Sequence, residues 1–320
     1  MKKVFIVLFG GLLFSNINAQ NNEWEDPTIY ERNKFQGHVD FIAYENDQQA
    51  RVDDFSESPY FLSLNGTWKF DLVNTPAERP TDFYEVDLDD SKWSDIKVPS
   101  NWELEGFGMP IYVNMGYCFP ANPPFVDNGF NPVGTYRRTF EVASDWGDKA
   151  VILNLSSVSG YAKIFVNGNE VGMTKVAKSP SEFDVTELVK IGENVIAIQV
   201  IRWHDGSYLE DQDFWRLSGL EQDVYLYALP KVSIWDFFLK AGLDANYQNG
   251  VFDATVDLKQ FSRTKTAGKV KVELFPVGES KAIFSSEKAF ADAKSSLKFD
   301  GIIRGVKKWS AETPNLYDCV

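Results

Sequence analysis

The stretch SLNGTWKFDL, residues 63–72, gives the first clear indication of the fold. After an Asn-Gly pair, apolar side chains recur at every second position, at Trp68, Phe70 and Leu72. Alternation of this kind is typical of a strand with one buried face, and Asn-Gly is a dipeptide that favours tight turns between strands. The stretch therefore predicts a strand that enters a β-sandwich.

Further strands are predicted on both sides of a second Asn-Gly pair, at residues 167–168, which we expect to close a hairpin. Residues 179–188 (SPSEFDVTEL) instead predict a turn followed by one helical turn. Together these elements predict a jelly-roll β-sandwich over residues 61–229. The other predicted strands, rich in β-branched and aromatic residues, cover residues 136–142, 150–155, 162–166, 170–171, 195–201 and 223–228.

A second domain is predicted from Pro230 onward. Residues 252–259 (FDATVDLK) and 269–275 (KVKVELF) alternate with a period of two, at a spacing typical of an immunoglobulin-like sandwich over residues 230–320. The predicted fold class is all-β, a jelly-roll β-sandwich followed by an incomplete immunoglobulin-like β-sandwich.

Because the sequence stops at Val320, we expect the second sandwich to be truncated and its core to be left open at one edge. The side chains expected to cover this unclosed core are Phe252, Val256, Val270, Val272 and Leu274.

Residues 1–19 have the pattern of a signal peptide: Lys2 and Lys3 precede an apolar run, and Ala19 offers a small residue at a cleavage site. We therefore expect a secreted or periplasmic protein. Residues 20–60, which are polar and irregular, are predicted to form an N-terminal arm.

The charge argues against two classes of partner. The formal net charge is −14, and it becomes −16 when Lys2 and Lys3 are removed, since residues 1–19 contain no acid. We expect neither a nucleic acid nor an anionic membrane to bind, because phosphate groups would repel this surface. The two cysteines, Cys118 and Cys319, lie in different predicted domains and are expected to remain thiols.

The segment RWHDGSYLEDQDFWRLSG, residues 202–219, is unusually rich in acids and aromatics. Carboxylates accept hydrogen bonds from neighbouring hydroxyls or bind a hard cation, and aromatic faces cover the C–H faces of a sugar ring. A polyol site is one interpretation. The alternative is a structural corner in which Arg202 and Arg216 pair with some of the four acids. The acids are Asp205, Glu210, Asp211 and Asp213, and the aromatics are Trp203, Tyr208, Phe214 and Trp215.

With four other motifs, this segment resembles the sugar-binding region of the glycoside hydrolase family 2 β-galactosidases. The resemblance runs from about residue 51 to residue 317 in the family's order and spacing. It implies that the N-terminal arm packs across neighbouring surfaces. The other motifs are PSNW at 99–102, PIYVN at 110–114, NPPF at 122–125 and SEFD at 181–184.

The resemblance implies that Asn114 and Asp213 reach the galactose pocket, and that Asp213 also helps to hold a sodium ion. It implies no catalytic residue here, because the family's two catalytic glutamates lie on a barrel that follows the immunoglobulin-like domain. Glu210 and Asp213 could hydrolyse a glycoside only if one carboxyl were protonated and the other ionised, and we expect the nearby arginines to keep both ionised.

A magnesium ion is implied for the full-length family enzymes, and Asp205 matches an acid that helps to hold one in some relatives. Lys175, however, stands where the resemblance leads one to expect a glutamine ligand. An ammonium group would compete with a cation there, and so no magnesium site is assigned to this chain.

Three functional hypotheses remain open. The chain is the N-terminal portion of a secreted β-galactosidase-like enzyme that binds a terminal β-galactoside, a free-standing carbohydrate-binding module, or a non-functional remnant. The sequence leaves oligomerisation, linkage and aglycone open. Whether the downstream coding sequence continues into a barrel would discriminate between the first two hypotheses.

Overall fold

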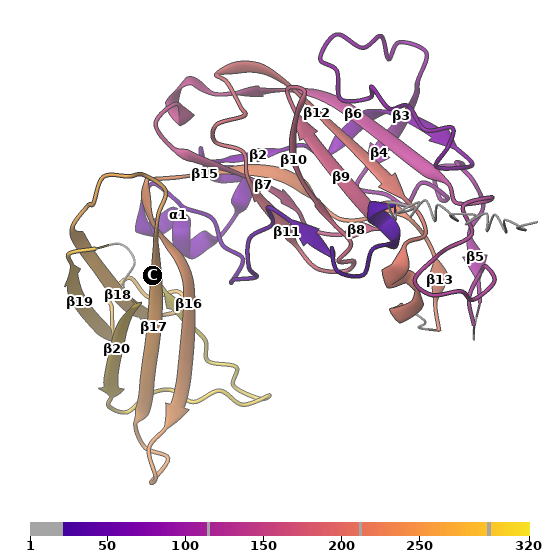
Figure 1. Cartoon of the computed structure of the whole chain (residues 1–320). Helices are drawn as coiled ribbons and strands as arrows, with labels where there is room; N and C mark the ends of the chain where they lie inside the picture. The colour runs from indigo at the N-terminus through magenta and orange to yellow at the C-terminus, as the bar shows by residue number, and fades with distance from the viewer. Residues whose placement is uncertain (1–21, 114–115, 211–212, 293–295) are drawn as a thin grey trace, which may run out of the picture.

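The protein, described by a computed structural model at residues 22–113, 116–210, 213–292 and 296–320, folds into two successive β-sandwiches (Figure 1). The predicted all-β class is confirmed. Short helices interrupt the sheets: α1 (Asp47–Val52), η1 (Glu23–Glu25), η2 (Phe55–Glu57), η3 (Ser144–Trp146) and η4 (Asp205–Leu209).

Several predictions from the sequence fall on residues outside these ranges. They are the signal peptide of residues 1–19, the sugar contact Asn114 and the loop acid Asp211. Within the described ranges, no helix has the length and apolar character that crossing a membrane requires.

The first sandwich pairs a sheet of seven strands with a sheet of four, and its central strands β6 and β12 form ten consecutive antiparallel pairs. The seven strands, in spatial order, are β1 (Glu31–Arg32), β10 (Asn169–Thr174), β9 (Tyr161–Val166), β12 (Gly192–Ile201), β6 (Val133–Val142), β3 (Gly66–Val73) and β4 (Ser94–Val98). The four strands are β11 (Ser181–Asp184), β7 (Ala150–Leu155), β15 (Val224–Leu229) and β2 (Phe61–Ser63).

The Asn65-Gly66 turn carries the chain from one sheet to the other, since β2 and β3 lie in different sheets. Gly66 has a φ of 124°, a backbone conformation that favours glycine. The Asn65 side chain accepts the backbone N–H of Val224 at 3.0 Å, which fastens the crossover to β15. The predicted turn is present, and it passes between sheets rather than closing a hairpin.

The second Asn-Gly pair does close the predicted hairpin. Strands β9 and β10 pair across it, and Asn167 and Gly168 have φ values of 50° and 79°. Positive φ at both central residues is what a type I′ turn requires, and this turn matches the twist of the strands it joins.

The prediction for residues 179–188 is wrong in its first part and confirmed in its second. Residues 185–189 form one helical turn, in which the backbone N–H of Val189 donates to the carbonyl oxygen of Val185 at 3.0 Å. Residues 181–184 form strand β11, which pairs with β7 at the edge of the smaller sheet. Phe183 is fully buried in the sandwich core, and this tertiary burial decides the local structure.

Aromatic packing fills the first sandwich beneath its larger sheet. Trp68, Phe70, Trp102 and Tyr136 are all buried in one cluster. The ring of Phe70 lies 6.0 Å from that of Trp102 and 4.7 Å from that of Tyr136. Trp102 of the PSNW motif is therefore a core anchor, and it exposes no surface to a sugar.

The second sandwich consists of two three-stranded sheets. The side chains expected to lie over an open core are instead buried between these sheets, and that expectation is corrected. Phe252, Val256, Val270, Val272 and Leu274 expose between 4% and 7% of their surface. The sheets are β16 (Val232–Leu243), β17 (Gly250–Gln260) and β20 (Ser296–Ile303), and β19 (Phe284–Phe290), β18 (Gly268–Pro276) and β21 (Tyr317–Cys319).

The N-terminal arm connects the two sandwiches. Its strand β1 extends the larger sheet beside β10, and α1 lies between the sandwiches (Figure 1). On the second sandwich, Phe35 packs against Trp235 with ring centroids 4.9 Å apart, and Arg51 of α1 pairs with Asp318 at 2.8 Å.

His38 fastens the arm to the jelly roll through both nitrogens of its ring. Nδ1 lies 2.8 Å from the carbonyl oxygen of Val39, and Nε2 contacts the carboxylate of Glu182. Asn154 and Tyr227 also donate to Glu182, each at 2.9 Å. Because both ring nitrogens face acceptors, this arrangement favours a protonated imidazole.

The pKa values of the pair shift in opposite directions. Burial lowers the pKa of His38, but its hydrogen bond to Glu182 outweighs burial and raises the pKa overall. Burial raises the pKa of Glu182, but His38, Asn154 and Tyr227 together hold it below its usual value. Each shift makes the ionised pair a source of stability.

We predict that this pair stabilises the fold most between about pH 4.5 and 6.5, the ordinary pKa values of the two groups. The raised pKa of His38 gives stability that is lost as the pH rises through that pKa. The lowered pKa of Glu182 gives stability that is lost as the pH falls through it. Denaturant unfolding across this range should show the largest difference between wild type and His38→Gln inside the window.

Lys69→Gln is the control, since Lys69 and Asp95 form an exposed pair at 2.8 Å whose residue types ordinarily titrate outside the window. A His38→Gln effect that is constant from pH 4 to 8 would contradict the assignment.

Candidate sugar-binding site

A two-stranded ribbon brings two distant motifs together. Strand β5 (Ile111–Tyr112) belongs to the PIYVN motif, and strand β13 (Trp215–Arg216) follows the LEDQD run. They pair antiparallel, with Tyr112 opposite Trp215. The ribbon therefore places Asp213 beside the segment that leads to Asn114, although Asn114 itself lies outside the described residues.

Asp213 is held at the surface by Tyr112. The Tyr112 hydroxyl donates a hydrogen bond to Oδ1 of Asp213 at 2.5 Å, and this bond raises the pKa of Tyr112 above its usual value. The rings of Tyr112 and Trp215 lie 5.5 Å apart, and both residues are about half exposed, at 51% and 53%. A carboxylate beside exposed aromatic faces is an arrangement that suits a polyol ring.

One buried ion pair clamps both ends of the 202–219 segment. Arg202 and Glu103 lie 3.3 Å apart, and their side chains expose 2% and 0% of their surface. Arg202 also donates to the carbonyl oxygen of Arg216 at 2.7 Å, while Glu103 accepts the backbone N–H of Ser218 at 2.9 Å. Arg202 thus pairs with an acid outside the segment. The structural-corner alternative expected Arg202 to pair with an acid inside it.

His204 caps the start of η4 inside this segment. Its Nδ1 accepts the backbone N–H of Gly206 at 3.1 Å, and Ser207 caps the backbone of His204 in return. His204 is fully buried and acts as a hydrogen-bonding residue within the loop.

The NPPF motif is bound to the same segment. The Tyr208 hydroxyl donates to the carbonyl oxygen of Phe125 at 2.6 Å and accepts the backbone N–H of Asn122 at 2.9 Å. The motif is therefore a support for the site loop.

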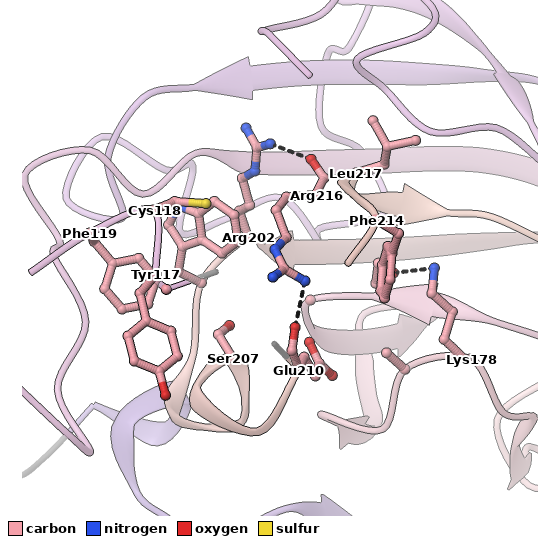
Figure 2. Close-up of a pocket in the computed structure, with 15 residues that line it drawn as sticks. Tyr117, Cys118, Phe119, Lys178, Arg202, Ser207, Glu210, Phe214, Arg216 and Leu217 are labelled. Atoms are coloured by element: carbon pink, nitrogen blue, oxygen red, sulfur yellow. Dashed lines mark hydrogen bonds between the residues drawn. The ribbon is translucent and has the colours of Figure 1, made fainter. Parts of the chain in front are cut away.

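Beside the ribbon lies a cavity of about 550 Å³ (Figure 2). Phe119 packs against Trp203 and Tyr208, with ring centroids 5.6 and 5.5 Å apart, and forms an aromatic wall. The cavity is lined by Gly116, Tyr117, Cys118, Phe119, Ser159, Gly160, Ala177, Lys178, Arg202, Trp203, Ser207, Glu210, Phe214, Arg216 and Leu217.

Phe214 lies between two cations at the opposite side of the cavity (Figure 2). The ammonium of Lys178 is 5.7 Å from its ring centroid, and the guanidinium of Arg216 is 5.3 Å from it. Such contacts hold an aromatic ring in place while leaving part of it accessible, and Phe214 is 38% exposed.

Glu210, which was expected to be ionised, lies in surroundings that work against its ionisation. Burial raises the pKa of its carboxyl, and the nearby charges of Lys178 and Arg216 offset this only in part. Arg216 donates to the backbone carbonyl of Glu210 at 2.6 Å (Figure 2). A carboxyl with a raised pKa can donate as well as accept a hydrogen bond at mildly acidic pH.

Most cavity residues were not identified from the sequence. Those at 116–119, 159–160 and 177–178 come from three separate connections that meet only in the folded protein. Two aromatic residues lie close together at 117–119, and this local signal could have indicated the aromatic wall of the cavity.

Asp213 and Asp205 are the two acids that the resemblance associates with metal ions. Among the described residues, no group of three or more His, Cys, Asp or Glu side chains could hold a metal ion. Asp213 supplies one exposed carboxylate, which suits a single ligand of a sodium ion but not a complete site. At Asp205, the ammonium of Lys175 lies 2.9 Å from Oδ1.

We predict that replacing Asp213 by Asn lowers the pKa of Tyr112 toward its ordinary value of 10.0, because the charged acceptor that holds the phenolic proton is lost. A tyrosine ring NMR titration measures this, with Tyr112→Phe to assign the resonance. An unchanged pKa of Tyr112 would show that the hydrogen bond is not maintained in solution.

Two family models match the two domains of the chain. Residues 61–230 match the family model described as "Glycosyl hydrolases family 2, sugar binding domain", and residues 232–320 match the model described as "Glycosyl hydrolases family 2".

Two β-galactosidases are among the relatives that match this chain in sequence. The β-galactosidase of Priestia megaterium is 36% identical over 308 residues, which cover 93% of this chain and 30% of that protein. The β-galactosidase of Vibrio cholerae is 36% identical over 316 residues, covering 96% of this chain and 30% of that protein. The chain thus spans about 30% of the length of these relatives.

A solved structure shares the fold. The β-glucuronidase of Bacteroides uniformis superposes with a TM-score of 0.64 at 20% identity, over 81% of this chain and 29% of that one. The chain belongs to glycosyl hydrolase family 2 and corresponds to the N-terminal portion of its glycosidases, including the family's sugar-binding domain.

Proposed function

We propose that this chain binds and positions a terminal β-galactoside as the N-terminal portion of a secreted β-galactosidase-like enzyme. Asp213 and Asn114 would reach the sugar, and the reacting carboxyls would lie on a barrel outside these residues. The observation that carries the proposal is the exposed carboxylate of Asp213, oriented by Tyr112 beside the ring of Trp215.

The choice of galactoside rests on the relatives. Two β-galactosidases are 36% identical to nearly the whole chain, whereas the β-glucuronidase structure is 20% identical. The LEDQD run at residues 209–213 also favours the galactosidase branch of the family. Secretion is proposed on the signal-peptide pattern of residues 1–19.

The chemistry of retaining glycosidases explains why this chain would bind the sugar while the barrel would carry out the reaction. Such enzymes need two carboxyls about 5–5.5 Å apart across the scissile bond. No residue of this chain matches either catalytic glutamate, so its contribution would be binding energy and orientation. Asp213 would share a sodium ion with the barrel. Its Oδ2, which has no hydrogen bond to the residues that the structure describes, would be available as one oxygen ligand.

A free-standing carbohydrate-binding module is the second candidate. The cavity of about 550 Å³ favours it, because jelly-roll residues alone line that cavity. Aromatic walls with a few polar groups are common in small-molecule sites. The two candidates differ in whether the chain binds a galactoside without a barrel.

We predict that Asp213→Asn, in a form of the protein that includes the barrel, weakens galactoside binding by about 1.5–3 kcal/mol, the range for hydrogen bonds to charged groups. Inhibition constants for a galactose analogue measure the loss. Asp95→Asn, which removes an exposed acid on β4, is the matched control and should have little effect. Equal kinetics for Asp213→Asn and wild type would refute the proposed role.

We predict that the 20–320 chain alone does not hydrolyse a chromogenic β-galactoside, because no pair of its carboxyls is assigned to the reaction. Turnover that disappears in Glu210→Gln would contradict this and would make the cavity itself catalytic. Saturable galactose binding without turnover, measured by calorimetry, would favour the free-standing module.

A further inference from the structure

Lys175 places a buried ammonium group among oxygen atoms from two other segments. Nζ lies 2.9 Å from Oδ1 and 3.1 Å from Oδ2 of Asp205, and 2.9 Å from the carbonyl oxygen of Asp26. The side chains of Lys175 and Asp205 expose 4% and 7% of their surface. This is a buried charge pair with further hydrogen bonding, which is the condition under which burial of two charges is tolerated.

The ammonium joins three parts of the fold. Asp26 belongs to the N-terminal arm, Lys175 follows the last residue of β10, and Asp205 begins η4 in the site loop. The backbone N–H of Lys175 also donates to the carbonyl oxygen of Tyr30 at 2.9 Å, which fixes the base of its side chain. Movement of the ammonium would therefore remove one contact from the arm and one from the start of the loop that leads to Asp213.

Carboxylate and carbonyl oxygens of this kind are also the ligands of hard cations. Here they already contact a positive charge that is part of the chain, and a divalent ion at the same oxygens would be repelled by it at close range. The residues present therefore do not fit the magnesium ion that the family resemblance associates with Asp205.

We propose that the Lys175 ammonium occupies the place of a metal cation between the carbonyl oxygen of Asp26 and the carboxylate of Asp205. These oxygen atoms then bind no magnesium ion. The arm and the site loop are then held together without a dissociable ion. This inference is independent of the sugar proposed for Asp213, because it concerns cohesion of the fold.

The first test uses the unmodified 20–320 chain. Thermal unfolding in EDTA and in millimolar MgCl₂ at matched ionic strength should give the same Tm, and calorimetric titration with MgCl₂ should show no saturable site that depends on Asp205. A saturable site that is lost in Asp205→Asn would overturn the proposal.

The second test removes the ammonium. Lys175→Gln should lower the Tm in EDTA by about 5 °C or more, since it leaves a buried carboxylate without its partner. Magnesium should restore part of this loss in Lys175→Gln, which offers an amide oxygen, and none in Lys175→Met. Lys69→Gln, at the exposed pair with Asp95, is the control and should shift the Tm little.

Two results of the second test would count against the proposal. A Lys175→Gln variant as stable as wild type in EDTA would mean that the ammonium does not hold the segments. A loss that magnesium restores equally in the Gln and Met variants would place the ion elsewhere. The titration of the unmodified chain remains decisive if either variant fails to fold.

Discussion

The pairing of β6 with β12 is the constraint on which the rest of the first sandwich depends. Ten consecutive residue pairs join these strands without a bulge, from Gly192 opposite Val142 to Ile201 opposite Val133. Ile196 and Ile198 face the core between the sheets, while Ala197 faces the cluster around Phe83. A slip of one residue would exchange these faces, so the register is strongly specified. The site segment begins directly after Ile201, and its position is therefore set by this pairing.

The ionic groups near the site differ in what they contribute. The pair of Arg202 and Glu103 is fully buried, and removal of either partner would leave an uncompensated charge. Asp213 is exposed and is bound by one neutral hydroxyl, so its carboxylate keeps capacity for a ligand. A rigid, desolvated base below an accessible acceptor is an arrangement that suits ligand binding, since little has to be ordered when a ligand binds.

The sequence predicted the features that rest on local chemistry. The hairpin at Asn167 and Gly168 follows from their tolerance of positive φ, and β7 was predicted over the residues it occupies. The ribbon of β5 and β13 could not be predicted, because strands of two residues carry no periodic signal and pair across a hundred residues. Residues 181–184 were misassigned since the burial of Phe183 depends on the opposite sheet. The cavity beside Glu210 was missed for the same reason, and the raised pKa of that carboxyl follows from burial that no composition reveals.

The clamp formed by Arg202 and Glu103 has a consequence for how such a site can diverge. Both ends of the site segment are attached to the sandwich through contacts to this pair, at residue 202 and at residues 216–218. Between these points Trp203 and His204 are buried in the fold, whereas Phe214 and Trp215 are exposed. Exposed positions of a loop that is fixed at both ends tolerate changes in composition. Phe214 and Trp215 can thus vary on a constant base. A lineage with this fold can reshape the exposed surface of the segment through these few positions, without repacking either sheet.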